Sequence, residues 1–264
     1  IEERDKKDGD WIVSEKKSVI QSSFMNDDYI INPSKNESSD SILEIIQRDT
    51  VPLSDISNIN FGMQLRYRKV YKNDVTKDIN TLTEYHTKCY TGKDISEYVA
   101  KYSGLYCYFN EEAKCGGCWD RKAQFACPKL LVRQIGRVPV VGIDENGYAV
   151  LNTAFMISGF KNDVSPYYLL GLLNSVLMKY YWINKFSDNR KQFPKIKGTY
   201  LGQLPIRRDV RFESLVQEKV KEILTNYSSQ TQESIDELIF DMYGLNGQEK
   251  VEIREYVSNT LGVN

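Results

Sequence analysis

The sequence lacks the motifs of several large enzyme classes. It has no Pro-Pro pair, which excludes an Asn/Asp-Pro-Pro-aromatic loop of the kind that amino-methyltransferases use; Asn32-Pro33-Ser34 is not one. It has no glycine-rich phosphate or dinucleotide fingerprint. The only histidine, His86, argues against a catalytic triad or a histidine-rich metal site. We therefore expect no catalytic residues and no organic cofactor in this chain.

Long apolar runs are also missing. No segment approaches the roughly 18 apolar residues that a membrane helix needs, and there is no signal peptide. These absences predict a soluble, cytoplasmic protein without a membrane partner. The 264 residues are 41% hydrophobic, enough for the core of one large domain or two modest ones. Because the chain starts at Ile1 and not at Met, we expect it to be part of a longer protein.

Charge is balanced overall but unevenly distributed. The net charge is −1, which by itself argues against nucleic acid as a partner. The net charge is −5 over residues 1–50, +3 over 51–178, +7 over 179–211 and −6 over 212–264. Since local patches and not totals attract phosphates, the basic middle of the chain favours an anionic partner.

The five cysteines form an odd set, which predicts reduced thiols and no disulfide framework. Cys115-Gly-Gly-Cys118 has the spacing of a metal knuckle, and Cys107 and Cys127 are near enough in sequence to complete a structural zinc site. The alternative interpretation is that Cys107 and Cys127, in apolar strand contexts, are small hydrophobic residues.

The pattern of apolar residues predicts an α+β fold with a mixed or antiparallel sheet core and a helical C-terminal tail. Strands are expected at 10–13, 51–61, 103–110, 128–136, 138–143 and 148–160, with a turn at Asp144–Gly147. Helices are expected at 41–47, capped by Asp40, at 167–181, opened by Ser165-Pro166, and at 212–224, 234–243 and 247–261. Gly62 is placed where a strand turns into a loop and a backbone can approach closely.

Basic and amide side chains interleaved with aromatic ones suit nucleic acid, because Arg and Lys neutralise phosphates or bind guanine and Asn and Gln bind adenine. Arg207 and Arg208 are further phosphate candidates, and Tyr67, Phe186 and Phe193 could stack on bases. Any one of these side chains alone is more typical of a solvated surface, so the prediction rests on the whole set. The predicted DNA-binding set is Gln64, Arg66, Arg68, Lys69, Arg133, Arg137, Lys185, Asn189, Arg190, Lys191, Gln192, Lys195 and Lys197.

Several of these segments, in this order, resemble the TaqI-like C-terminal specificity domain, the target-recognition domain of adenine-N6 DNA methyltransferases and type II restriction-modification enzymes. The similar segments within residues 51–245 are SDISNINFGMQLR, TGKDISEY, PKLLVRQIG, LNTAF, YLLGLLNSVLMKYY, FPKIKGTYLGQLPI and IDELIFDMYGL. Residues 111–126, with the CGGC motif, look like an insertion in this pattern.

The resemblance implies that this chain binds double-stranded DNA in a sequence-specific way. An upstream domain, absent from this chain, would bind S-adenosylmethionine and methylate a flipped adenine. Residues 1–50 would be the tail of that domain and a linker, 51–211 the target-recognition domain and 212–264 a helical segment.

Two other functions stay open at this point. The acidic helices of 212–264 also suit a non-catalytic specificity or assembly subunit that binds protein partners. The cysteine cluster also suits a zinc-containing, nuclease-associated domain. Salt-sensitive DNA binding and metal content, respectively, distinguish them.

Overall fold

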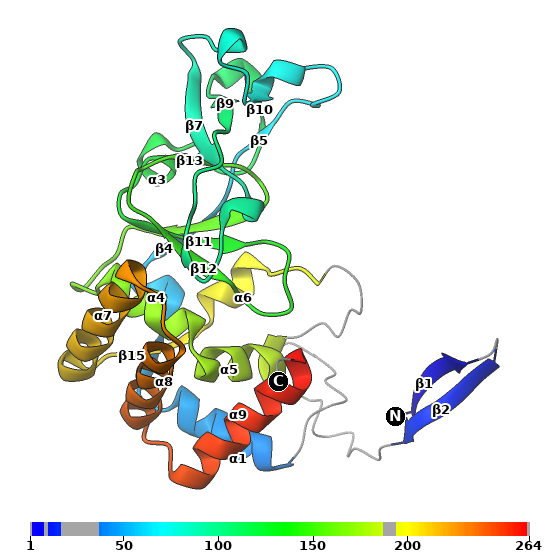
Figure 1. Cartoon of the computed structure of the whole chain (residues 1–264), viewed down its shortest axis with the longest axis vertical. Helices are drawn as coiled ribbons and strands as arrows, with labels where there is room; N and C mark the ends of the chain where they lie inside the picture. The colour runs from blue at the N-terminus through cyan, green and yellow to red at the C-terminus, as the bar shows by residue number, and fades with distance from the viewer. Residues whose placement is uncertain (1, 8–9, 17–36, 187–193, 263–264) are drawn as a thin grey trace.

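The structure, a computed structural model, describes residues 2–7, 10–16, 37–186 and 194–262 and has an α+β fold. Figure 1 shows small sheets at one end of the long axis, a central sheet in the middle and helices at the other end. No described helix is long and apolar enough to cross a membrane.

The strands are β1 Glu2–Lys7, β2 Asp10–Lys16, β3 Thr50–Pro52, β4 Asn58–Phe61, β5 Gln64–Leu65, β6 Val75–Thr76, β7 His86–Tyr90, β8 Tyr98–Val99, β9 Tyr106–Tyr108, β10 Lys114–Gly116, β11 Lys129–Arg133, β12 Val141–Asp144, β13 Ala149–Val150, β14 Ala154–Ser158 and β15 Pro205–Arg207. The helices are α1 Glu37–Gln47, α2 Leu53–Ile56, η2 Lys72–Asp74, η3 Ile79–Thr81, η4 Gly92–Asp94, η5 Glu111–Ala113, α3 Arg121–Gln124, α4 Pro166–Asn174, α5 Val176–Phe186, α6 Gly198–Gly202, α7 Val210–Thr225, α8 Ser229–Tyr243 and α9 Gly247–Leu261.

The central sheet has the strand order β4-β14-β11-β12-β8, antiparallel except for the β12–β8 pair. Alternation along β11 places Leu130 and Val132 in the core shared with the helices, and Leu131 in a smaller cluster on the other face. The strands predicted at 128–136 and 138–143 are therefore confirmed in shorter form, and both faces of the sheet are covered.

The turn between β12 and β13 is built around a buried ion pair. The Lys129 ammonium lies 2.5 Å from an Asp144 carboxylate oxygen, and both side chains have no exposed surface. Lys129 also donates to the carbonyls of Ala126 and Tyr148. Asp144 accepts the backbone N–H groups of Asn146, Gly147 and Tyr148. The predicted turn is confirmed, and its first residue is tied to the sheet by a charge pair that the sequence pattern did not reveal.

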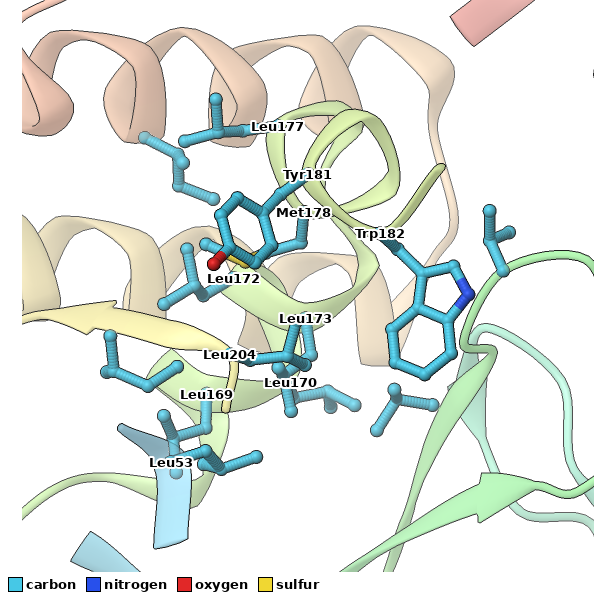
Figure 2. Packing of buried hydrophobic residues seen from close by; sticks show 14 of the residues in the cluster. Leu53, Leu169, Leu170, Leu172, Leu173, Leu177, Met178, Tyr181, Trp182 and Leu204 are labelled. Atoms are coloured by element: carbon cyan, nitrogen blue, oxygen red, sulfur yellow. The ribbon is translucent and has the colours of Figure 1, made fainter. Parts of the chain in front are cut away.

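The apolar segment 167–181 forms two helices and not the single one predicted. Ser165 caps α4 and Pro166 is its first residue, as predicted. The helix ends at Asn174, whose buried amide bonds both the N–H and the C=O of Val141 in the sheet. A new helix, α5, begins at Val176, whose N–H is capped by Asp236 of α8. Leucines of α4 and aromatic residues of α5 pack together with Leu53 and Leu204, so this segment is scaffold (Figure 2).

The segment 51–61 is not the continuous alternating strand predicted. Leu53 and Ile56, three residues apart, lie on one buried turn of helix, α2, between β3 and β4. Three-residue spacing suits a helical turn, whereas the pair Ile59 and Phe61 has the two-residue spacing of a strand. Asp40 does not cap the first described helix either, because α1 already begins at Glu37.

The C-terminal helices complete the main core. The left-handed Gly244 ends α8, as predicted. Tyr243 of this helix donates to the carbonyl of Pro205 and accepts from the N–H of Arg207, which fixes the tail against β15. The core contains residues of 1–50, 51–211 and 212–264 together, for example Ile46, Leu170 and Ile239.

Candidate nucleic-acid interface

The end of β11 and the segment that returns after the basic loop lie side by side. Ile135 and Lys195 form an antiparallel bridge, the Ile196 N–H donates to the Gln134 carbonyl at 2.8 Å, and the Gly136 N–H donates to the Pro194 carbonyl at 3.1 Å. Ile196 is buried and anchors the returning segment in the core. Cations from two distant parts of the sequence are thereby mounted on one rigid base; we call this base the 134–196 junction.

The cations at this junction, and Lys185 near the end of α5, are exposed or partly exposed. Arg137, Lys195 and Lys197 are exposed, and Arg133 and Lys185 are partly exposed. Among the described residues, none of the five has a carboxylate within ion-pair distance. Lys197 donates to the Tyr200 hydroxyl at 3.1 Å and lies over its ring. Positive charge without internal neutralisation is what a phosphate-binding surface requires.

The predicted residues Asn189, Arg190, Lys191 and Gln192 lie outside the described residues, as does Phe193. The described chain on either side of them ends at Phe186 and resumes at Pro194. Phe186 is not available to stack on a base, because it is buried and stacks on Tyr200 with ring centroids 4.9 Å apart.

The other predicted set, after Gly62, divides into exposed and engaged residues. Gln64, Arg68 and Lys69 are exposed. Arg66 makes two hydrogen bonds to the carboxylate of Asp74, at 3.0 and 2.8 Å, and its guanidinium lies 4.0 Å from the centre of the Tyr71 ring. Hydrogen bonding to Asp74 also raises the pKa of Arg66. Arg66 is therefore better described as a residue that holds its loop than as a free DNA contact.

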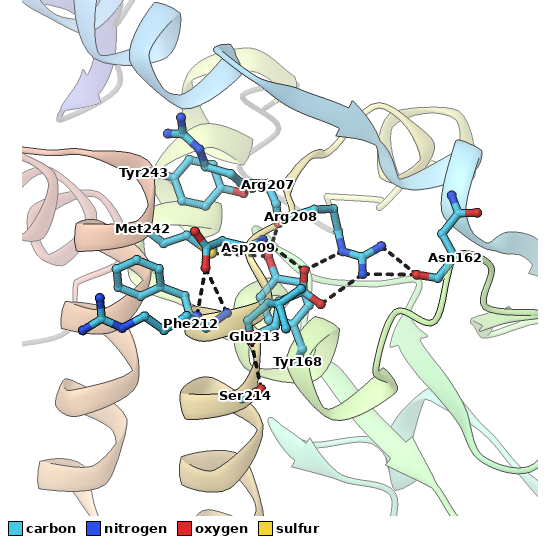
Figure 3. Close-up of polar contacts among 12 residues, drawn as sticks. Asn162, Tyr168, Arg207, Arg208, Asp209, Phe212, Glu213, Ser214, Met242 and Tyr243 are labelled. Atoms are coloured by element: carbon cyan, nitrogen blue, oxygen red, sulfur yellow. Dashed lines mark hydrogen bonds and ion pairs between the residues drawn. The ribbon is translucent and has the colours of Figure 1, made fainter.

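Arg207 and Arg208 do not fit the phosphate-binding role that the sequence suggested. Arg208 donates to both carboxylate oxygens of Glu213, at 2.6 and 3.1 Å, and to the Asn162 carbonyl (Figure 3). Arg207 pairs with Asp49 at 3.3 Å and lies over the Tyr243 ring. Arg208 therefore joins the start of α7 to the connection between β14 and α4, and Arg207 contacts Asp49 and the end of α8, which are structural roles.

The cysteines predicted to bind zinc are not gathered into one site. Cys107 is buried beside Cys89, whereas Cys115 and Cys127 are exposed and Cys118 is partly exposed. No three His, Cys, Asp or Glu side chains in the described part of the chain are placed to hold a metal. Apolar surroundings raise the pKa of the Cys107 thiol, as expected for a small hydrophobic residue.

The glycines of Cys115-Gly-Gly-Cys118 have a packing role instead. Gly117 has φ +69°, and a Cβ there would lie 2.1 Å from the carbonyl oxygen of Gly62. The Cys118 N–H donates to the Phe61 carbonyl at 3.0 Å. Gln124, fully buried, bonds the Cys118 carbonyl and both backbone groups of Val150. Backbone contacts of Gly117 and Cys118 and the side chain of Gln124 therefore hold this segment on the sheets.

Replacing Cys115 and Cys118 together by serine should lower the melting temperature by no more than about 4 °C, the shift that about 1 kcal/mol produces in a chain of this size, because Cys115 is exposed and Cys118 is only partly buried. Thermal denaturation with and without EDTA measures this. The matched variant Cys107→Ser, which puts a hydroxyl into the buried position, should lower the melting temperature clearly. A large loss for the Cys115/Cys118 variant, or with EDTA, would instead support a metal site.

Sequence reasoning missed a tyrosine cluster around Lys88 on β7. The Lys88 ammonium lies 5.5 Å from the centre of the Tyr102 ring and 5.2 Å from that of Tyr148, and it donates to the Tyr148 hydroxyl. The only signal was the high count of 18 tyrosines, because the polar segment 73–91 has no clear period. Lys88 is an exposed cation, held by the rings beneath it.

A groove of about 1210 Å³ runs beside the edge strand β4. Its lining includes Asn58, Asn60, Gln203, one lysine (Lys122) and one aspartate (Asp120). These two charges cancel, so the groove does not supply the net positive charge that distinguishes the 134–196 junction.

Comparisons with known proteins find a family match and similar folds. Residues 87–206 match the sequence model of the TaqI-like C-terminal specificity domain. No curated protein matches the chain. The fold is similar to that of the Type IIL restriction-modification enzyme MmeI, solved in complex with DNA, with a TM-score of 0.54 and 12% identity over 81% of this chain and 36% of that one. It is also similar to the type IIG restriction endonuclease BpuSI, with a TM-score of 0.50 and 11% identity over 78% of this chain and 33% of that one.

The chain thus spans about a third of the length of these two structures. At such identities the likeness shows the fold, whereas the family match covers β7 to β15 and includes the 134–196 junction. Residues 87–206, a little under half of the chain, therefore match the TaqI-like C-terminal specificity domain, and this match supports a DNA target-recognition role of the kind found in restriction-modification systems.

Proposed function

We propose that this chain is the sequence-specific, double-stranded-DNA recognition module of a restriction-modification adenine-N6 methyltransferase. The S-adenosylmethionine-dependent domain lies outside this chain, and residues 1–50 connect to it. Arg133, Arg137, Lys185, Lys195 and Lys197 contact phosphates, and Gln64, Arg68, Lys69 and the segment Asn189–Gln192 supply further contacts. This chain supplies the recognition and no catalytic group, because it lacks the Asn-Pro-Pro-aromatic loop.

The observation that carries the proposal is the 134–196 junction. Its cations come from β11, the β11–β12 connection and the returning segment, and no described carboxylate pairs with them or with Lys185 at the end of α5. The backbone that holds them is hydrogen-bonded on both sides, since the Gln134 N–H also donates to the Thr153 carbonyl. Groups fixed on rigid elements contact a ligand more precisely than groups on free loops.

Replacing Arg133, Arg137 and Lys195 together by alanine tests the proposal. Each lost phosphate contact should reduce the slope of log K against log salt concentration by about 0.9, so the three together should reduce it by about 2 to 3. Binding to a random duplex of about 30 base pairs, titrated at several salt concentrations, measures the slope.

A charge-matched control replaces Lys114, Lys219 and Lys250 by alanine. These lysines are paired with Glu111, with Glu222, and with both Glu237 and Asp241, respectively. Its net charge change is the same, but its salt slope should stay within about 0.5 of the parent. Equal slopes for the parent and the junction variant would contradict the proposed phosphate contacts.

A protein-binding role is the second candidate, and it concerns a different part of the chain. Residues 212–264 have a net charge of −6, and Leu215 and Val251 are exposed on α7 and α9. An acidic surface repels DNA, so we assign these helices to contact with other subunits or domains of the restriction-modification system. Salt-insensitive association, with no binding to duplex DNA, would favour this role for the chain as a whole.

A further inference from the structure

The loop Tyr67–Asn73, which we call the tip loop, follows β5 in the sheets farthest from the helices (Figure 1). The N–H groups of Val70 and Tyr71 both donate to the Tyr67 carbonyl, at 3.0 and 3.1 Å, which makes a tight turn. The Asp74 N–H then donates to the Tyr71 carbonyl at 3.2 Å. The backbone of the loop is therefore folded on itself.

The base of the tip loop is fixed by side chains. The Arg66–Asp74 pair closes it, and Asp74 is only 6% exposed. The single histidine also serves here: one ring nitrogen of His86 lies 2.9 Å from the Asn73 carbonyl, and the other accepts the Thr83 N–H at 3.0 Å. The His86 ring therefore bridges Asn73 and Thr83. The lone histidine thus has a structural role, and these contacts fix the base of the tip loop.

The side chains that this fixed loop presents are apolar at its centre and basic around it. Tyr67 is 64% exposed and Val70 is 68% exposed. Arg68, Lys69 and Lys72 are exposed, and no described carboxylate pairs with them. A rigid loop that exposes apolar groups between cations is complementary to an anionic partner with an apolar feature in a recess.

Duplex DNA has this combination. Phosphates line the major groove, and the apolar group on its base edges is the C5 methyl of thymine. The groove is about 12 Å wide and admits a two-stranded ribbon, so a single tight turn also enters it. A protein partner would also bury Val70, but its binding would not depend on a thymine methyl group. Dependence on thymine therefore distinguishes a DNA partner from a protein partner.

We propose that the tip loop enters the major groove of the target duplex and that Val70 packs on a thymine methyl group, while Arg68 and Lys69 contact the flanking phosphates. This inference rests on the proposed function and adds one element of the recognised sequence, an A·T pair. Val70 is the specificity-determining residue of this contact.

The test starts with the 264-residue parent chain and a random-sequence duplex library, from which bound DNA is selected and sequenced. In the selected duplex, each thymine is then replaced in turn by deoxyuridine, which lacks only the methyl. Burying one methyl contributes about four-fold in affinity, so one replacement should weaken parent binding by about four-fold. Val70→Ala should bind the thymine duplex about as weakly as the parent binds that uridine duplex, and should no longer distinguish the two.

Val251→Ala is the matched control, because Val251 is also an exposed valine, 47% exposed, on α9. It should distinguish thymine from uridine as the parent does. If the parent selects a sequence but Val70→Ala keeps the parent's discrimination at every thymine, the inference is wrong and the proposed function stands. If the parent selects no sequence and binds no duplex, the proposed function itself fails, and the inference fails with it.

Discussion

Replacing Lys129 by methionine is expected to lower the free energy of unfolding by about 3 to 5 kcal/mol, the usual cost of removing one partner from a buried ion pair. The substitution leaves the Asp144 carboxylate without a counter-charge in a site that has no exposed surface. It also leaves the carbonyls of Ala126 and Tyr148 without their Lys129 donor. Urea denaturation followed by circular dichroism measures the change as a shift of midpoint at constant slope.

Removing the other partner of the pair, by Asp144→Leu, should lower the free energy of unfolding by at least as much. It leaves the buried Lys129 ammonium without a counter-charge and also removes the acceptor of three backbone N–H groups in the 144–148 turn. Burial lowers the pKa of Lys129 even with Asp144 beside it, so desolvation outweighs the attraction for this ammonium. The double variant Lys129→Met/Asp144→Leu should therefore cost less than the sum of the two single variants.

The exposed pair Lys114–Glu111 provides the comparison. Lys114→Ala should change the free energy of unfolding by less than about 0.5 kcal/mol, because exposed pairs at this spacing contribute little. If Lys129→Met were as mild as Lys114→Ala, the buried pair could not be the structural centre of this turn. Exact additivity in the double variant would show that the two charges do not interact.

Local patterns in the sequence were sufficient to predict those helix ends and turns that interactions between neighbouring residues determine. Ser165-Pro166 starts a helix because a hydroxyl cap and a preset φ act within a few residues, and Gly244 ends one because it adopts a left-handed conformation. Asp144 begins a turn because its carboxylate accepts N–H groups two to four residues onward. The motif order of the specificity domain was also visible, and the family match confirms it over residues 87–206.

Several of the errors arose where a residue distant in the sequence decides the outcome. The break between α4 and α5 depends on Asn174 bonding Val141, 33 residues away. Composition alone does not show that Arg208 is held by Glu213 and Asn162 whereas Arg137 is free of described carboxylates. Cysteine spacing predicted a metal knuckle, but the two glycines between the cysteines are required by a neighbouring backbone. A list of cations from sequence therefore contains both scaffold and candidate contacts, and only the tertiary structure separates them.

The sequence predicted a close backbone approach at Gly62, but it did not show which distant segments approach there. A Cβ at Gly62 would lie 2.2 Å from the carbonyl oxygen of Leu151, and a Cβ at Gly117 would lie 2.1 Å from that of Gly62. Three backbone segments are thus stacked without side chains between them. The Gly62 N–H donates to the Ala154 carbonyl, and the Met63 N–H donates to the Val150 carbonyl. These hydrogen bonds tie the segment at Gly62 to the segment 150–154, so the two cannot separate to make room for a methyl group.

Gly62→Ala is therefore expected to lower the free energy of unfolding by about 3 kcal/mol, the upper part of the usual range for overpacking, because the atoms that a methyl would meet are backbone and cannot rotate aside. Urea denaturation measures the loss. Gly247→Ala is the control: no atom lies within 4 Å of a Cβ there, and Gly247 is the first residue of α9, so this variant should be neutral or more stable by up to about 1 kcal/mol. Because Gly62 leads into β5 and the tip loop, Gly62→Ala should also weaken sequence-specific DNA binding more than binding to random duplex. Unchanged stability in Gly62→Ala would contradict the stacking of these three backbone segments.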